Sequence, residues 1–114
     1  MRRALASALL AMGAAGCVST AELARVGLSE ADILALETGG WENQVRIRNL
    51  EPQTRPLAVR DLHCTRPRRV EAYRCFYALE FGVPGSVPRA MRRRQYLGHD
   101  EDGRWEFLII VSSG

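Results

Sequence analysis

Apolar residues following position 28 recur at helical spacing. Ser29 predicts an N-cap, Asp32 lies three residues later as in a capping box, and Leu28 with Ile33 can form a hydrophobic staple. The adjacent pair Gly39–Gly40 follows this stretch and predicts the end of the helix. We therefore expect one well-marked helix that begins after Ser29 and ends before the two glycines.

The segment before it also carries helix signals. Ser19 and Glu22 have the spacing of a second capping box, and Gly27 marks a stop. A helix over 20–26 is so short that it is marginal by itself in water. Residues 17–28 are therefore expected to form either this short helix or a flexible tether.

From position 45 onward the hydrophobic period falls to two, which is typical of strands. Val45 and Ile47 alternate with arginines, and this predicts a half-exposed strand over 45–48. Residues 51–56 contain two prolines and are expected to form a loop, because proline cannot serve a central strand.

Four longer strands are expected after this loop. The first, over 57–64, changes the parity of its apolar residues, which predicts a bulge near Arg60–Asp61. The clearest strand alternates aromatic, aliphatic and cysteine residues with polar ones: Tyr73, Cys75, Tyr77, Leu79 and Phe81 share a face. Strands over 93–97 and 104–111 form a hairpin whose turn contains Asp102–Gly103.

These elements predict an α+β fold. One or two N-terminal helices pack on a four-stranded antiparallel sheet, so that one sheet face is covered and the other meets solvent. Residues 29–114 form a single domain, and the chain shows no internal repeat.

Residues 1–16 follow a different pattern. Arg2 and Arg3 precede an uncharged run from Ala4 to Ala15, and small residues end it. A charged start, a short apolar run and small residues are typical of a secretory signal peptide. The run is too short to span a bilayer. A buried N-terminal helix is the alternative, and the run is apolar on all sides instead of on one face.

The end of this run, Ala14-Ala15-Gly16-Cys17, resembles the lipobox of bacterial lipoproteins, although that family more often has Leu at the position of Ala14. The resemblance implies cleavage before Cys17 and attachment of acyl chains such as palmitate to this cysteine. Val18 replaces the Asp that the family uses for inner-membrane retention, which implies the outer membrane, facing the periplasm. Ordinary cleavage at a small residue, without lipidation, is the competing interpretation.

Removing residues 1–16 also changes the charge. The 114 residues contain 16 basic and 13 acidic side chains, and two of the basic ones are Arg2 and Arg3. The remaining 98 residues therefore carry a formal charge of +1, which gives no argument for a nucleic-acid partner. The arginines cluster in two places, first as Arg66, Arg68 and Arg69 and then as Arg92, Arg93 and Arg94. They are candidate anion-binding residues, and solvated surface charge is the simpler interpretation.

Cys64 and Cys75 flank the turn between two predicted strands. Residues that lie opposite each other on neighbouring strands come within disulfide range, and an oxidising envelope compartment favours the bond. A reduced pair of buried thiols is the alternative. If the bond forms, we interpret it as a stabilising element and not as a redox site.

The sequence contains no convincing catalytic or metal motif, and no cofactor is expected. His63 and Cys64 are neighbours on a strand, so their side chains point to opposite faces. A zinc site from His63, Cys64, Cys75 and His99 lacks the usual close ligand pairs. Residues 100–102 resemble a fragment of a calcium loop, but its next ligand position falls on Arg104.

The leading hypothesis is a lipid-anchored cell-envelope protein without catalytic activity, which acts as a structural or protein-binding module on an envelope partner. Two alternatives remain. One is the binding or sensing of an anionic lipid or small ligand, with the arginine clusters at the rim of a pocket. The other is inhibition of a periplasmic enzyme. The aromatic residues that could line such a pocket, or simply form core, are Tyr73, Tyr77, Phe81, Trp105 and Phe107.

Overall fold

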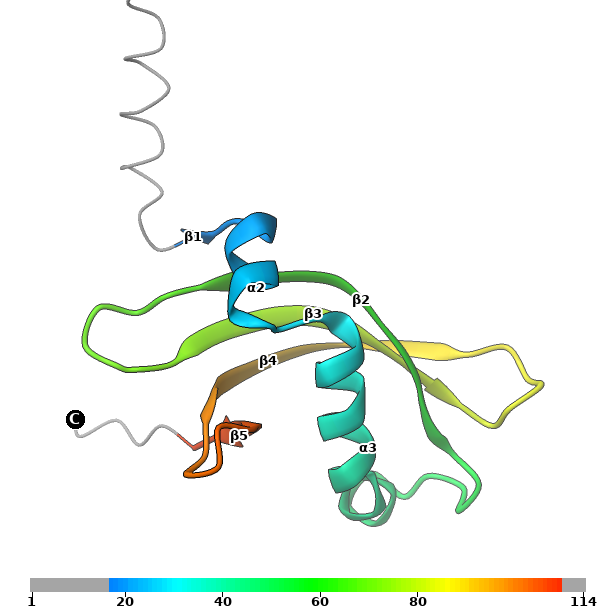
Figure 1. Cartoon of the computed structure of the whole chain (residues 1–114). Helices are drawn as coiled ribbons and strands as arrows, with labels where there is room; N and C mark the ends of the chain where they lie inside the picture. The colour runs from blue at the N-terminus through cyan, green and yellow to red at the C-terminus, as the bar shows by residue number, and fades with distance from the viewer. Residues whose placement is uncertain (1–16, 110–114) are drawn as a thin grey trace, which may run out of the picture.

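The computed structural model describes residues 17–109 and comprises two helices and one five-stranded antiparallel sheet (Figure 1). The predicted signal peptide and the predicted strand residues 110 and 111 lie outside the described residues. The elements in chain order are β1 (Cys17–Val18), α2 (Thr20–Val26), α3 (Glu30–Ile47), β2 (Arg55–Thr65), β3 (Tyr73–Gly82), β4 (Arg89–His99) and β5 (Trp105–Leu108).

The α+β class is confirmed, but the sheet has five strands instead of four. Its order is β1-β2-β3-β4-β5, so each strand pairs with its sequence neighbours. The added strand is β1, in which Cys17 pairs with Thr65 and Val18 pairs with Cys64. Two residues carry no detectable period, so a strand this short leaves no pattern in the sequence.

The predicted strand over 45–48 is wrong, because α3 runs through Gly39 and Gly40 as far as Ile47. Trp41 explains the continuation. Its ring is buried, and its Nε1 donates to the carbonyl of Thr54 at 2.7 Å. The centres of the Trp41 and Phe81 rings are 5.5 Å apart. Two glycines in a helix cost about 2 kcal/mol together. Burying a tryptophan contributes about 3 kcal/mol or more, so the helix continues.

Both predicted N-caps are confirmed. The Ser19 side chain accepts a hydrogen bond from the backbone N–H of Glu22, and residues 20–26 form a helix instead of a tether. Ser29 and Asp32 form a complete capping box. Gly27 ends α2 in the left-handed conformation with φ of 76°, which a side chain rarely adopts.

The alternation of β3 and the disulfide are also confirmed. The odd-numbered residues of β3 are buried, from Tyr73 to Phe81. Cys64 lies opposite Cys75, and the two sulfur atoms are bonded. The predicted bulge occurs in β2, where the register shifts between Arg60 and His63 and Asp61 has a φ of 57°.

The sheet therefore has two different faces. The inner face carries the odd-numbered residues of β3, and α2 and α3 lie across it (Figure 1). The outer face carries the even-numbered residues of β3 and β4, and neither helix covers it. Of the described residues, those at the centre of this outer face are His63, Arg74, Phe76, Arg92, Arg94 and Tyr96.

Candidate binding surfaces

Three consecutive arginines in β4 were predicted to act together, and the structure separates them. Arg93 lies on the inner face, whereas Arg92 and Arg94 are exposed on the outer face. The reason is the strand period of two, which turns neighbouring side chains to opposite sides. The prediction that five arginines form one rim around an aromatic pocket is therefore wrong.

Arg93 belongs to a buried polar cluster. Its Nε donates to Oε2 of Glu37 at 2.8 Å, and a terminal nitrogen donates to Oε1 at 3.2 Å. The hydroxyl of Tyr77 donates to the same Glu37 oxygen. Glu37 is 2% exposed, so its charge is compensated by these partners alone. Arg93 holds the helix on the sheet and is not free to bind an anion.

The cluster also shifts proton affinities. Burial and the hydrogen bond to the Glu37 carboxylate raise the pKa of Tyr77 far above its ordinary value. Burial acts against the charged form of Arg93, but the hydrogen bond and the negative charge of Glu37 raise its pKa on balance. Tyr77 therefore stays a neutral donor and Arg93 stays a cation.

The outer face combines arginines with aromatic rings. Phe76 stacks on His63 at 5.2 Å between ring centres, and the Arg74 guanidinium lies 5.7 Å from the centre of the Phe76 ring. Arg94 is the cross-strand partner of Phe76, and Arg92 is that of Ala78. Within residues 17–109, neither Arg92 nor Arg94 forms an ion pair. Two cations without an ion-pair partner among the described residues therefore lie on the β4 side of the Phe76 ring.

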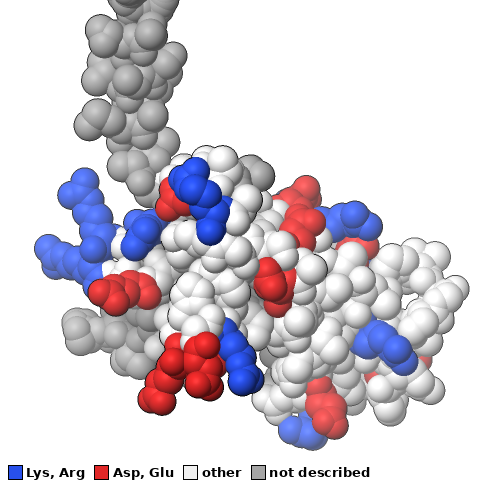
Figure 2. Space-filling view, in the orientation of Figure 1, with Lys and Arg blue, Asp and Glu red and all other residues white. Residues whose placement is uncertain are grey.

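The predicted arginine cluster that includes Arg68 and Arg69 lies at the same end of the molecule as Cys17. Cys17 is exposed and pairs with Thr65, the last residue of β2. The β2–β3 turn begins at the next residue, and its Arg68 and Arg69 are exposed. Figure 2 shows basic side chains gathered at this end. The structure thus joins the predicted lipidation residue to one of the two arginine clusters and separates it from the other.

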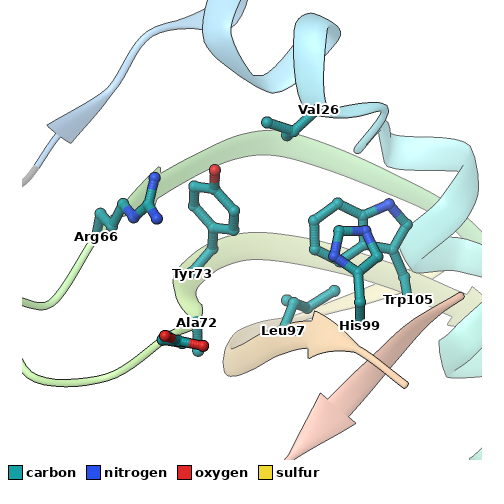
Figure 3. A pocket seen from close by; sticks show the side chains of 9 residues that line it. Val26, Arg66, Ala72, Tyr73, Leu97, His99 and Trp105 are labelled. Atoms are coloured by element: carbon teal, nitrogen blue, oxygen red, sulfur yellow. The ribbon is translucent and has the colours of Figure 1, made fainter. Parts of the chain in front are cut away.

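The predicted aromatic set is divided between core and cavity. Tyr77 and Phe81 are buried in the core cluster that includes residues of α3. Tyr73 also belongs to the core cluster, and together with Trp105, Val26, Arg66 and His99 it lines a cavity of about 450 Å³ beside the C-terminal end of α2 (Figure 3). Arg66 belongs to the predicted arginine cluster of the β2–β3 turn, but the predicted rim of the pocket included only Arg68 and Arg69 from that turn.

The other sites considered from the sequence, namely a His63–Cys64 pair, a zinc site and a calcium loop, are not formed by the described residues. His63 stacks on Phe76 on the outer face, His99 lies beside Trp105, and the sulfurs of Cys64 and Cys75 are bonded to each other. The Asp100 carboxylate accepts hydrogen bonds from the backbone N–H groups of Asp102 and Arg104, and the bond from Arg104 is the main cause of its lowered pKa. The Asp100 carboxylate therefore closes the β4–β5 turn.

Glu37 is the residue that sequence reasoning missed. It lies four residues after Ile33 and four before Trp41, so all three share one face of α3. An acidic residue between two apolar positions at helical spacing indicates a buried carboxylate that needs a partner. The predicted helix end at Gly39 concealed this signal.

No family model, curated protein or solved structure matches this chain. In the part of the chain that the structure describes, no helix is long and apolar enough to cross a membrane. Residues 17–109 also contain no cluster of three His, Cys, Asp or Glu side chains that could hold a metal ion. The candidate binding surfaces are therefore the outer face, the end that carries Cys17 and the cavity.

Proposed function

We propose that this protein is a lipid-anchored, non-catalytic module of the cell envelope that binds an acidic protein partner through the outer sheet face. The leader and the Ala14-Ala15-Gly16-Cys17 lipobox support the anchor. The uncovered face carries the proposal, because its arginines and aromatic rings are the residue types enriched at protein interfaces.

The charge of this face favours an acidic partner. Arg60 is paired with Glu80 at 3.1 Å, whereas Arg92 and Arg94 have no ion-pair partner among the described residues. A carboxylate of a partner can meet each guanidinium in a bidentate pair. Phe76 is half-buried on the neighbouring strand opposite Arg94 and supplies apolar contact area at the centre, where contacts contribute most to affinity.

The anchor is tested by fatty-acid labelling of the wild-type chain and of Cys17→Ser. We expect label in the wild type and none in the variant. Equal labelling of both, or none in either, contradicts the anchor.

The interface is tested in cells with a photo-crosslinking residue at position 92 and, as the control, at position 46, which is exposed on α3. We expect a discrete adduct with an envelope protein from position 92 alone. Changing Arg94→Glu is expected to remove that adduct, since it reverses a charge on the same face. The matched change Arg25→Glu, on α2, leaves it intact. Adducts that are identical from both positions contradict the interface.

A second candidate function is contact with anionic lipid headgroups at the end that carries Cys17. The observation that favours it is the place of Arg68 and Arg69 on the turn that follows Thr65, the partner of Cys17 in the sheet. Each basic residue near an anionic surface contributes about 1 kcal/mol. Because Cys17 is the proposed anchor, contact of Arg68 and Arg69 with headgroups orients the domain on the membrane.

Vesicle binding separates the two candidates. With Cys17→Ser protein that lacks residues 1–16, we expect binding to vesicles that contain phosphatidylglycerol and less binding after Arg68→Gln with Arg69→Gln. The control pair Arg92→Gln with Arg94→Gln has the same change in charge. Binding that depends on the control pair instead, or that ignores anionic lipid, contradicts the headgroup contact.

A further inference from the structure

The cavity between α2, the β2–β3 turn and the β4–β5 hairpin has the features of a small-molecule site. Its volume of about 450 Å³ lies in the lower part of the range of ligand sites. Val26 at the end of α2 lies above it, Tyr73 and Leu97 come from the sheet, and Trp105 with His99 forms one side (Figure 3). Neither the proposed anchor nor the proposed protein interface uses it.

The aromatic side of the cavity is held in place before any ligand binds. Trp105 donates from Nε1 to the carbonyl of Gly27 at 3.0 Å, and its ring lies 3.9 Å from that of His99 and 6.0 Å, edge-on, from that of Tyr73. Fixed rings of this kind offer flat apolar surfaces, which stack well on the C–H faces of another ring.

The polar groups lie on the other side. The Arg66 guanidinium is 5.3 Å from the centre of the Tyr73 ring. Its nearest described carboxylate, Glu22, is 4.0 Å away, so much of its hydrogen-bonding capacity is unused. The Tyr73 hydroxyl makes no hydrogen bond with any described residue and points toward the side where Arg66 and Val26 lie (Figure 3). A guanidinium and a phenol side by side favour a carboxylate.

Glu71 also lines the cavity and narrows the class of ligand. A carboxylate is an acceptor only, so it repels a second anionic group and accepts from hydroxyl groups. An acyl chain is disfavoured, because Arg66, Glu71 and His99 would lose hydration against it. The cavity thus combines a stacking wall, one cation for one carboxylate and one acceptor for hydroxyl groups.

We propose that this cavity binds a sugar acid, a monosaccharide-sized ring that carries one carboxylate. The ring packs against the wall that the Trp105–His99 pair forms, the carboxylate meets Arg66 and the Tyr73 hydroxyl, and ring hydroxyl groups donate to Glu71.

The experiment uses the full chain and three probes: glucuronate, glucose and benzoate. Calorimetry measures affinity, and tryptophan fluorescence reports whether the probe is at the cavity, since Trp105 lines it and Trp41 is buried in the core. We expect glucuronate to bind about tenfold more tightly than glucose, because a hydrogen bond to a charged group is lost with glucose. Benzoate, which lacks hydroxyl groups, is expected to bind more weakly than glucuronate.

Two variants test the assignment of residues. Arg66→Gln is expected to reduce glucuronate affinity about tenfold and to remove the preference over glucose. Tyr73→Phe removes only the hydroxyl group and is expected to weaken glucuronate a few-fold. Arg25→Gln is the matched control, because Arg25 is exposed on α2 and does not line the cavity, and it leaves affinity unchanged. A melting curve of each variant shows that it is folded.

Several results overturn the proposal. They are the absence of heat and fluorescence change with glucuronate at millimolar concentration, benzoate binding as tight as that of glucuronate, and equal effects of Arg66→Gln and Arg25→Gln. None of these outcomes depends on lipidation of Cys17 or on the outer face.

Discussion

Adjacent arginines in β4 lie in two different environments. Arg93 faces α3 and is bound to a carboxylate that is 2% exposed, whereas Arg92 and Arg94 face away from both helices and have no ion-pair partner among residues 17–109. The chain carries the same side chain at all three positions. What differs is the face of the sheet and therefore the dielectric environment.

This difference separates stability from binding. A charge on the covered inner face must be compensated inside the protein, so Arg93 and Glu37 act as a structural pair. A charge on the uncovered outer face is solvated and contributes little to folding, so Arg92 and Arg94 are free for a partner. Changes on the inner face should then alter the free energy of unfolding, and changes on the outer face should leave it nearly constant.

The largest expected effect comes from Arg93→Met. The Glu37 carboxylate would remain buried with Tyr77 as its only partner, and we expect a loss of about 3 kcal/mol in the free energy of unfolding. Urea denaturation measures it. Arg92→Met is the matched control on the outer face and should change stability by less than about 0.5 kcal/mol. Equal effects of the two variants would remove the distinction between the faces.

The double variant Glu37→Leu with Arg93→Met sharpens this prediction. Replacing both charges by apolar side chains removes the unpaired carboxylate, so the double variant should be more stable than Arg93→Met alone. If the two losses instead add, the pair is not coupled.

The second effect concerns the disulfide on the inner face. Cys64 and Cys75 are 11 residues apart in sequence, and the bond restricts the unfolded chain. We expect Cys64→Ala with Cys75→Ala to lower the free energy of unfolding by about 2–3 kcal/mol. Thermal unfolding of the wild type with and without a reducing agent provides the comparison, since reduction should match the double variant. An unchanged melting temperature would show that the bond does not contribute.

The third effect is a dependence on alkaline pH. The pKa of Tyr77 is raised in the folded protein, so the unfolded chain loses this proton near its ordinary pKa of 10.0 while the folded chain keeps it. The contribution of Tyr77 is therefore complete below pH 10.0 and is lost progressively as the pH rises above it. Urea denaturation across this range should show a smaller decline for Tyr77→Phe than for Tyr96→Phe, whose side chain lies on the outer face. An identical decline of stability with pH in the two variants would contradict this role of Tyr77.

The smallest effect concerns the helix that covers the inner face. A Cβ at Gly39 would meet no other atom within 4 Å, and the helical backbone there accepts any residue. Gly39→Ala should stabilise the protein by about 0.5–1 kcal/mol. Gly27→Ala, at φ of 76°, should destabilise it by about 1 kcal/mol. Both are measured by urea denaturation, and a loss of stability in Gly39→Ala would contradict the prediction for that position.

Local signals in the sequence determined much of this fold. The caps at Ser19 and Ser29, the stop at Gly27, the bulge at Asp61 and the alternation of β3 were all predicted, because each depends on a few neighbouring residues. The Cys64–Cys75 pair followed from two adjacent strands. The lipobox also lies in the sequence alone, and lipidation of Cys17 stays a prediction.

Only the tertiary structure decided which residues share a site. The helix passes Gly39–Gly40 because Trp41 is buried against Phe81, a contact between residues 40 positions apart. The packing of α3 on the inner face places Glu37 over Tyr77 and Arg93, and Tyr73 and Trp105 line a cavity with Arg66 beside Val26, the last residue of α2. Burial and ion pairing are properties of three-dimensional neighbours, so the spacing of three arginines along a strand could not show which one would be buried.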